Sequence, residues 1–350
     1  MGNQFSSKIK LQEKANKSFS SQHIDSSSNA STFSSNQPKL PTEYVYPSNE
    51  AEANRQSGQH YLFKHLFQGN FFAPVDAILN QPGSKTLDIG CGPQASWLTD
   101  MAMDYPQCEF HGFDIAELSF DEVERMHLPN NLILKRADLF DGFDYESNTF
   151  DFVHQRVMYN VYPQDKIPWM FQEILRITKP NGWIELVEPD IKPKRAGPLF
   201  TTFVDAVHQL FKSRLGKYIQ GRQLVNLMVE AGFRDVKSDY GSLPCCWGGY
   251  IGKLMYENLL VIFRHLGPSI YSSVGLEGDF DERRYEALLD KAFDECVEYQ
   301  TFINFRWTIV AVVMQTLLLL ETRTRLSEIA IWDHVHTYAP FDFLLKQVPS

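Results

Sequence analysis

The stretch Thr86–Pro93, which reads Thr-Leu-Asp-Ile-Gly-Cys-Gly-Pro, constrains the fold of this chain more than any other feature. Its first four residues are mostly apolar or β-branched, as at the end of a buried strand. Gly90 and Gly92 follow, and residues without a Cβ atom allow a sharp turn and the close approach of a ligand. A helix over about Ala95–Tyr105 is predicted next. Strand, glycine turn and helix together are typical of the nucleotide-binding corner of a doubly wound sheet.

Composition excludes several classes of protein. The 350 residues, 43% of them hydrophobic, suffice for one large domain or two modest ones. The formal net charge of −10 argues against nucleic acid as the main partner. The five cysteines show neither a paired framework nor a C-x-x-C motif, so we expect a reducing, cytoplasmic compartment and no metal site. No apolar run follows the first lysines, so we expect no secretory signal.

The first forty residues differ from the rest of the chain. Met1–Ser6 fits the pattern M-G-x-x-x-[ST], which predicts N-myristoylation at Gly2. Nearby lysines are the usual second signal for membrane association, and here they are Lys8, Lys10, Lys14 and Lys17. An acylated tail with peripheral membrane contact and an unmodified tail both remain open. Ser18–Ser35 is rich in serine and poor in apolar residues, so residues 1–40 are predicted to be a disordered tail.

Alternating apolar segments predict the order of elements in the folded part. Residues 41–82 are expected to form N-terminal helices, with the longest at Glu50–Gln68. Strands are predicted at Lys85–Ile89, Glu109–Phe113, Leu132–Lys135, Phe150–Gln155, Trp183–Val187, Phe233–Tyr240 and Phe305–Met314. Helices are predicted at Lys166–Ile177, Gln223–Ala231, Tyr250–His265 and Glu282–Tyr299. We therefore expect an α/β fold over residues 83–316. It has a doubly wound, mostly parallel seven-stranded sheet and a helical cap inserted at about 245–300, before the last strand. Residues 317–350 have no predicted role.

Acidic residues lie near or just after the carboxyl ends of the first three predicted strands. Asp88 lies in the first, Asp114 ends the second and Asp138 follows the third. Ligands of open α/β sheets bind outside the carboxyl ends of the strands, so these carboxylates are expected to meet in one crevice. An acidic residue about twenty positions past the glycines suits two ribose hydroxyls. A helix cap or a solvated turn is the structural alternative for Asp114.

The motifs at the ends of these strands resemble those of class I S-adenosylmethionine-dependent methyltransferases, in their order along the chain and in their placement on the strands. The resembling segments are Leu87–Gly92, Asp114, Ala137–Leu139 and Lys179–Glu185. The resemblance covers about Gln59–Tyr240 clearly. It continues more faintly through Cys245–Gln315, which is similar to the cap and final strand of fungal small-molecule and regulatory methyltransferases of that class. S-adenosylmethionine is the cofactor that this resemblance implies.

The resemblance also implies a role for individual residues. Asp88 would anchor the methionine ammonium and Asp114 the ribose hydroxyls. Ile115 would pack on the adenine, whose exocyclic amine would donate to Asp138. Gln155 would line the site near the sulfonium. The full set of implied cofactor-binding residues is Asp88, Gly90, Cys91, Gly92, Asp114, Ile115, Asp138, Leu139 and Gln155.

Two other functions remain as alternatives. Gly90–Ala95 also satisfies G-x-G-x-x-[GA], so an NAD-dependent oxidoreductase is the less favoured reading of the same turn. A dehydrogenase would not need Asp88, Asp138 or the segment Lys179–Glu185. A non-catalytic or regulatory protein that keeps the cofactor fold is the second alternative, because fold does not decide function.

Methyl transfer from a sulfonium is an in-line displacement, so no catalytic residue is obligatory. If a base exists, His154, Tyr159 and Glu188 are the candidates, although a packed strand histidine explains His154 equally well. Arg156 and Tyr159 are also candidates for shaping an acceptor pocket. The predicted cap is rich in aromatic and aliphatic residues, which favours a small or lipophilic acceptor over nucleic acid.

Overall fold

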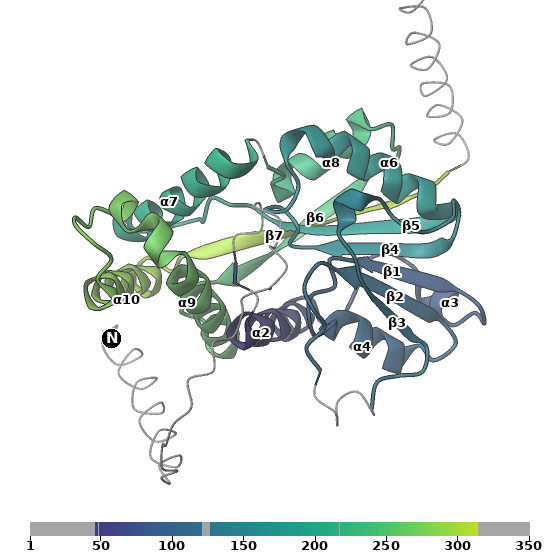
Figure 1. The fold of residues 1–350 in the computed structure, drawn as a ribbon, viewed down its shortest axis with the longest axis horizontal. Helices are drawn as coiled ribbons and strands as arrows, with labels where there is room; N and C mark the ends of the chain where they lie inside the picture. The colour runs from purple at the N-terminus through teal and green to yellow at the C-terminus, as the bar shows by residue number, and fades with distance from the viewer. Residues whose placement is uncertain (1–45, 48, 121–126, 217, 314–350) are drawn as a thin grey trace, which may run out of the picture.

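A computed structural model describes residues 46–47, 49–120, 127–216 and 218–313 (Figure 1). The predictions for Gly2, for the serine-rich tail and for residues 317–350 lie outside this part of the chain. The described helices are α2 (Glu50–Phe67), α3 (Asp76–Leu79), α4 (Ser96–Asp104), α6 (Ile167–Ile177), α7 (Pro198–Leu215), α8 (Leu224–Glu230), α9 (Tyr250–Ile270) and α10 (Glu282–Glu298). The described strands are β1 (Lys85–Ile89), β2 (Glu109–Asp114), β3 (Leu132–Arg136), β4 (Phe150–Arg156), β5 (Thr178–Pro189), β6 (Lys237–Pro244) and β7 (Phe302–Ala311). No helix within these ranges is both long and apolar enough to cross a membrane.

The strands form one seven-stranded sheet in the order β3-β2-β1-β4-β5-β7-β6. Strands β1 to β5 pair in parallel, whereas β7 runs antiparallel to its neighbours β5 and β6. This confirms the predicted mostly parallel α/β sheet. Strand β1 is buried on both faces, with Leu87 and Ile89 in one apolar cluster and Asp88 only 5% exposed.

Helices cover both faces of this sheet (Figure 1). Helix α6 has apolar residues at helical spacing, so one stripe of its surface is buried against the sheet together with α8. The buried residues of that stripe are Ile167, Met170, Phe171, Ile174 and Leu175. On the opposite face Trp97, Leu98 and Met101 of α4 pack with α3 against Phe110 and Phe152. The glycine turn after β1 is thereby fixed between two packed layers.

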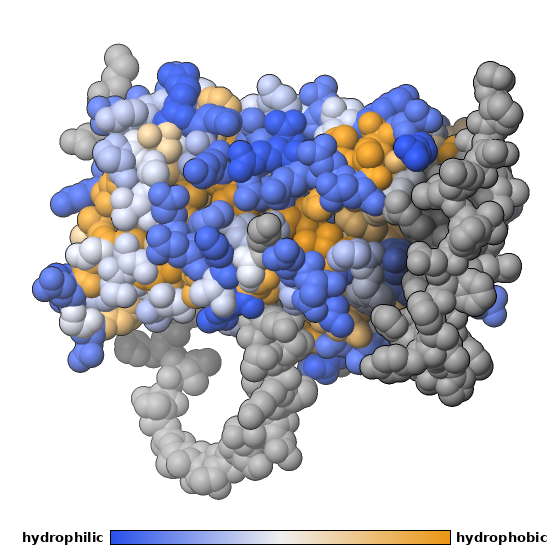
Figure 2. Space-filling view, turned by 90° about the horizontal axis from the view of Figure 1, so that it is seen from above, coloured by the Kyte–Doolittle hydropathy of each residue, from blue (hydrophilic) through white to orange (hydrophobic). Residues whose placement is uncertain are grey.

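A third apolar cluster lies beyond the sheet, where α2, α7, α9 and α10 meet (Figure 1). Asn49 caps α2 by accepting a hydrogen bond from the Glu52 backbone N–H at 2.9 Å. Helix α2 then packs along α9, and α7 packs against α9 and α10. The Tyr285 hydroxyl of α10 donates to the Phe263 carbonyl of α9 at 2.7 Å. Hydrophilic side chains cover much of the face seen in Figure 2, and the hydrophobic surface between them is broken into separate areas.

The structure corrects several predicted elements. Strand β5 begins at Thr178, directly after α6, rather than at Trp183. Strands β6 and β7 are displaced from their predicted positions, because the Phe302–Ala311 segment pairs with Lys237–Pro244 over eight residues. Helices α9 and α10 do lie between β6 and β7, as the predicted cap requires. Helix α7 was not predicted; it lies between β5 and α8 in the sequence and packs against the two cap helices.

Candidate active site

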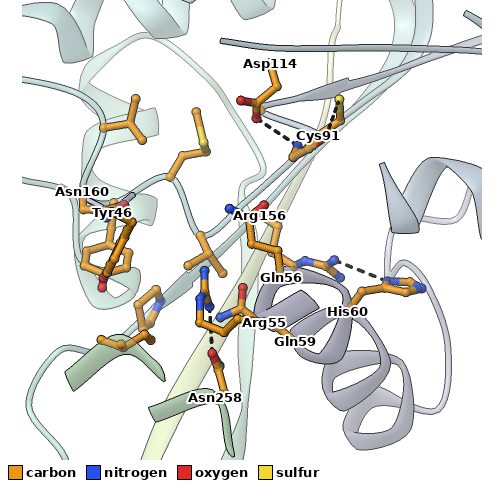
Figure 3. A pocket seen from close by; sticks show the side chains of 18 of the residues that line it. Tyr46, Arg55, Gln56, Gln59, His60, Cys91, Asp114, Arg156, Asn160 and Asn258 are labelled. Carbon is orange, nitrogen blue, oxygen red and sulfur yellow. Dashed lines mark hydrogen bonds between the residues drawn. The ribbon is translucent and has the colours of Figure 1, made fainter. Parts of the chain in front are cut away.

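A cavity of about 230 Å³ opens at the carboxyl ends of the parallel strands, where α2, α7 and α9 approach the sheet (Figure 3). Its two ends differ in chemistry. At the carboxylate end it is lined by Asp88, Asp114 and Asp138, which lie near the end of β1, at the end of β2 and just after β3. At the apolar end it is lined by Ile191, Phe200, Val204, Val207, Phe211, Leu259, Ile262, Phe263, Ile303 and Phe305.

Most predicted cofactor residues line this cavity. They are Asp88, Gly90, Cys91, Gly92, Asp114, Ile115, Asp138 and Leu139, and the candidate Tyr159 lines it as well. Gly90 and Gly92 have φ angles of 70° and 75°, which confirms the turn that two residues without Cβ atoms predicted. The N–H groups of Gly90 and Cys91 donate to the Phe113 carbonyl at 3.0 and 3.2 Å. The turn is therefore bonded to the end of β2.

Asp88 is bound by His154 on the side away from the cavity. The His154 Nδ1 atom lies 2.7 Å from Asp88 Oδ1, and the imidazole stacks on Trp97 with ring centroids 3.9 Å apart. His154 is 1% exposed and does not line the cavity. It is therefore placed to orient the Asp88 carboxylate, not to touch an acceptor, so the structure does not place it as a base.

Asp114 joins the glycine turn to the end of β2. Its Oδ2 accepts from the Gly92 N–H at 2.9 Å and its Oδ1 from the Ala116 N–H at 2.8 Å. Burial raises the pKa of this carboxyl group, and the two backbone donors oppose that shift. Each carboxylate oxygen has two acceptor sites, so both can accept further hydrogen bonds from a ligand diol. The alternatives of turn carboxylate and ligand-binding carboxylate are thus compatible at Asp114.

Apolar side chains surround Asp138 at the far edge of the carboxylate end. Phe113, Ile115, Leu139 and Phe140 line the cavity there. Asp138 caps the short helix that follows it, with its Oδ1 accepting from the Phe140 N–H at 2.9 Å. An apolar slot with a carboxylate beside it suits a purine ring.

Gln155 does not line the cavity. Side chains alternate along β4, and Gln155 is on the face of the sheet opposite to His154. Its Oε1 accepts from the Tyr162 hydroxyl at 2.8 Å within the core. The predicted place of Gln155 near the sulfonium is therefore not supported by its orientation.

Glu188 holds the segment that follows β4. Its carboxyl oxygens accept from the Met158 and Tyr159 N–H groups at 2.9 and 3.1 Å. Burial raises the pKa of Glu188 to about 8, although the two N–H donors lower it. Val157 beside them has a φ of 57°, which is strained for a β-branched residue. Glu188 does not line the cavity, so it fixes a strained loop rather than acting as a base.

Arg55 lines the cavity and is paired with the carboxylate of Glu52. Arg55 of α2 donates from Nε and Nη2 to Glu52 at 2.8 and 2.6 Å, and from Nη1 to Asn258 at 2.7 Å (Figure 3). Tyr46 and Tyr159 are buried, which raises both pKa values, that of Tyr159 to about 12. Both hydroxyls therefore remain protonated at neutral pH and serve as hydrogen-bond partners.

The sequence did not predict that α2 and α7 would contribute to this site. Helix α2 supplies Arg55, Gln56, Gln59 and His60 to the cavity, and its contacts with α9 connect residues about two hundred positions apart. A local signal for α7 did exist. Gly197-Pro198 places a proline at the start of a helix, and Phe200, Val204, Val207 and Phe211 follow at helical spacing.

Comparison with known proteins decides the family. A family model described as "Methyltransferase domain" matches residues 59–238, which is just over half of the chain. The chain belongs to this methyltransferase family. The sheet order, with antiparallel β7 between β5 and β6, is typical of class I methyltransferases and differs from the 3-2-1-4-5-6 order of the dinucleotide fold. S-adenosylmethionine is the cofactor of this family, and the NAD interpretation of the glycine turn is not supported.

Curated relatives of this methyltransferase come from fungi. The N-methyltransferase verN of Clonostachys rogersoniana is 30% identical over 196 residues, which are 55% of this chain and 66% of the relative. The N-methyltransferase tcpN of Claviceps purpurea is 34% identical over 143 residues, 40% of this chain and 49% of that one. The secondary metabolism regulator laeA of Coprinopsis cinerea is 28% identical over 150 residues, 42% of this chain and 36% of that one. The chain thus spans between about a third and two thirds of these relatives.

The residues of the carboxylate end fit S-adenosylmethionine. A buried carboxylate at Asp88 suits its ammonium group, and Asp114 has acceptor sites for its ribose diol. The slot beside Asp138 suits its adenine. The donor and acceptor chemistry of the cavity therefore matches the ligand in three places.

Proposed function

We propose that the protein transfers the methyl group of S-adenosylmethionine to a nitrogen atom of a small, mostly apolar molecule. The observation that carries this proposal is the continuity of one cavity from the carboxylate end to the apolar end. The carboxylate end suits the cofactor, and the apolar end lies next to it with Tyr46, Tyr159 and Asn160 on its wall. An acceptor in the apolar end would therefore meet the cofactor in a space that residues of α7 and α9 line.

The protonation states near the apolar end favour nitrogen as the acceptor atom. Tyr46 and Tyr159 stay protonated, and burial lowers the pKa of His60, whose two ring nitrogens both contact neighbouring side chains. None of these side chains, among the described residues, is poised as a base for an aliphatic alcohol. An amine nitrogen with a free lone pair needs no base before attack. The names of verN and tcpN as N-methyltransferases support the same choice.

The contribution of the protein to such a reaction is alignment and exclusion of water. The bound cofactor supplies a methyl group on a sulfonium for in-line displacement. Asp88, oriented by His154, fixes the amino acid end, and Asp114 fixes the ribose. The segment held by Glu188 brings Met158 and Tyr159 to the wall between the two ends of the cavity.

Incubation with methyl-tritiated S-adenosylmethionine tests the proposal. The acceptors are two matched panels of small apolar compounds, one of amines and one of the corresponding aliphatic alcohols. We expect label in products of the amine panel and none in the alcohols. Transfer to alcohols at comparable rates would contradict the assignment of a nitrogen acceptor.

A regulatory protein that binds the cofactor without turnover is the second candidate. It is favoured by relatives named as secondary metabolism regulators, from Coprinopsis cinerea among others. Binding of S-adenosylmethionine with no labelled product from either panel or from a small-molecule extract would favour this candidate.

We also propose that the chain is cytoplasmic and is acylated at Gly2, which gives it weak peripheral contact with membranes. The support is the M-G-x-x-x-[ST] pattern together with the lysines that follow it. Mass spectrometry of the N-terminus after expression in a eukaryotic host tests this. An increment of one myristoyl group on Gly2 is expected, and an unmodified Gly2 or retained Met1 would refute it.

A further inference from the structure

Arg156 differs from the other buried or half-buried arginines that form hydrogen bonds to side chains. Arg55, Arg176 and Arg306 each pair with a carboxylate, namely Glu52, Glu173 and Asp190. In the part of the chain that the structure describes, no carboxylate lies within 4.0 Å of the Arg156 guanidinium. Its hydrogen bond is to His60 Nδ1, from Nη2 at 3.4 Å, and the Phe63 ring covers one face with 5.0 Å between Cζ and the ring centroid.

This guanidinium lines the cavity at the carboxylate end (Figure 3). Burial lowers its pKa to about 10, although Asp88 and Glu185 act in the opposite direction. Asp88 and Glu185 act on the guanidinium only from beyond ion-pair distance, and a desolvated cation with no carboxylate in direct contact is costly, because the protein does not replace the hydration that it removes. A ligand with a negative group would supply the missing partner.

The position of Arg156 relative to Asp88 indicates what that ligand group is. Asp88 pairs with His154 across β1 and β4, and Arg156 is two residues further along β4. Side chains two apart on a strand share a face, so the carboxylate and the guanidinium lie on the same side of the sheet. An α-amino acid carries its ammonium and its carboxylate on one carbon atom. Such a zwitterion can therefore contact both side chains at once.

We propose that Arg156 binds the carboxylate of the methionine moiety of S-adenosylmethionine, while Asp88 binds its ammonium group and His60 of α2 positions Arg156. This proposal rests on the proposed function, because it assigns one group of the cofactor. It makes a helix outside the sheet part of cofactor recognition.

His60 can hold Arg156 only in one neutral form. An arginine has donors and no acceptor, so His60 Nδ1 must supply a lone pair and the ring proton must be on Nε2. Nε2 then donates to Asp100 Oδ2 at 3.2 Å. Asp100 also accepts from Lys64 Nζ at 2.5 Å and from Asn70 Nδ2 at 3.1 Å. The ring is thereby fixed from the α4 side.

Protonation of His60 would remove this support. The charged groups that face the imidazole are Asp100 on α4, Lys64 on α2 and Arg156 on β4. An imidazolium would direct a second N–H at the guanidinium, so two cations would repel each other. Affinity for the carboxylate should then fall as His60 becomes protonated at acidic pH. A His60→Gln variant should lack that part of the pH dependence.

Two ligands that differ only in the carboxylate test the proposal. They are S-adenosylhomocysteine and its decarboxylated analogue, titrated into the full chain by calorimetry. We expect the wild type to bind the analogue roughly 10- to 150-fold more weakly, the range of a charged hydrogen bond. Equal affinity of the wild type for both ligands would overturn the proposal without any variant.

Variants then locate the effect. Arg156→Met should weaken S-adenosylhomocysteine to the level of the analogue and leave the analogue within about twofold, whereas Arg156→Lys should fall between. Arg264→Met is the control, because it breaks an exposed ion pair with Glu286, and neither residue lines the cavity. Equal losses for both ligands in Arg156→Met, with melting temperature preserved, would contradict the assignment. If the folded wild type bound neither ligand, the proposed function itself would fail.

Discussion

Replacing Asp88 with asparagine removes one charge from the carboxylate end of the cavity and keeps the shape of the side chain. In the wild type Asp88 is 5% exposed, and its Oδ1 lies 2.7 Å from His154 Nδ1. An asparagine oxygen can still accept from His154, so we expect folding to be changed by less than about 1 kcal/mol. The charged hydrogen bond to a ligand ammonium is lost. Such bonds contribute about 1.5–3 kcal/mol, which corresponds to roughly a 10- to 150-fold loss of affinity.

Calorimetric titration with S-adenosylhomocysteine measures this loss. Asp151→Asn is the matched control, because Asp151 is a partly buried carboxylate at the other end of the sheet. Its Oδ2 accepts from the Lys85 N–H at 2.8 Å and from Lys179 Nζ at 2.7 Å. We expect the control to bind the ligand within about twofold of the wild type. If Asp88→Asn also stayed within twofold while remaining folded, the role of Asp88 as the ammonium partner would be refuted.

Three further predictions concern the apolar end, the loop after β4 and the packing of α9. Val204→Trp should fill the apolar end, so that the acceptor KM rises or turnover stops while the affinity for S-adenosylhomocysteine stays unchanged. Because the pKa of Glu188 is raised to about 8 in the folded state, its carboxyl group stays protonated up to a higher pH in the folded protein than in the unfolded chain. The Glu188 contribution to the unfolding free energy should thus fall from about pH 4.5 to pH 8, by up to about 1.4 kcal/mol per pH unit. Urea unfolding should show this slope in the wild type and not in Glu188→Gln, and parallel curves would contradict it. Gly252→Ala would place a Cβ atom 1.6 Å from the Trp247 carbonyl oxygen and should destabilise the fold by more than about 1 kcal/mol. Gly58→Ala in α2, where the added Cβ atom would meet no neighbouring atom within 4 Å, should instead stabilise the fold by about 0.5–1 kcal/mol. A melting temperature equal to that of the wild type would contradict the prediction for either variant.

The sequence predicted that Asp88, Asp114 and Asp138 would lie in one crevice, and they line one cavity, because the signals for this placement are local. The turn at Gly90 and Gly92 requires positive φ angles, which glycine adopts readily. The two glycines in the sequence therefore suffice to predict it. Asp114 and Asp138 were placed by a rule of α/β sheets, since the carboxyl ends of parallel strands meet at one edge. No long-range contact had to be known.

The orientation of Gln155 could not be predicted from local signals. Its position at the end of β4 was correct, but its face was not. Alternation along the strand places Phe152 and His154 on one face and Val153 and Gln155 on the other. Deciding which face looks into the cavity required the pairing of Asp88 with His154, which is a contact between residues 66 positions apart.

The contribution of α2 and α7 to the cavity was missed for a related reason, although Arg156 and Tyr159, which were predicted to shape a pocket, do line it. Residues of α2 lie in the cavity because α2 packs along α9, and that packing depends on buried pairs such as Arg55 with Asn258. Helix propensity indicated that α2 exists but not where it docks. Helix α7 has a recognisable start at Gly197-Pro198, but no helix was predicted there.

Titration of the full chain with S-adenosylmethionine and S-adenosylhomocysteine tests most directly whether this cavity is a cofactor site. We expect one molecule of either ligand to bind per chain, with a rise in melting temperature for each. We expect neither effect with NAD. A folded chain that gave no heat and no thermal shift with either adenosyl ligand would contradict the assignment of Asp88, Asp114 and Asp138 to the cofactor.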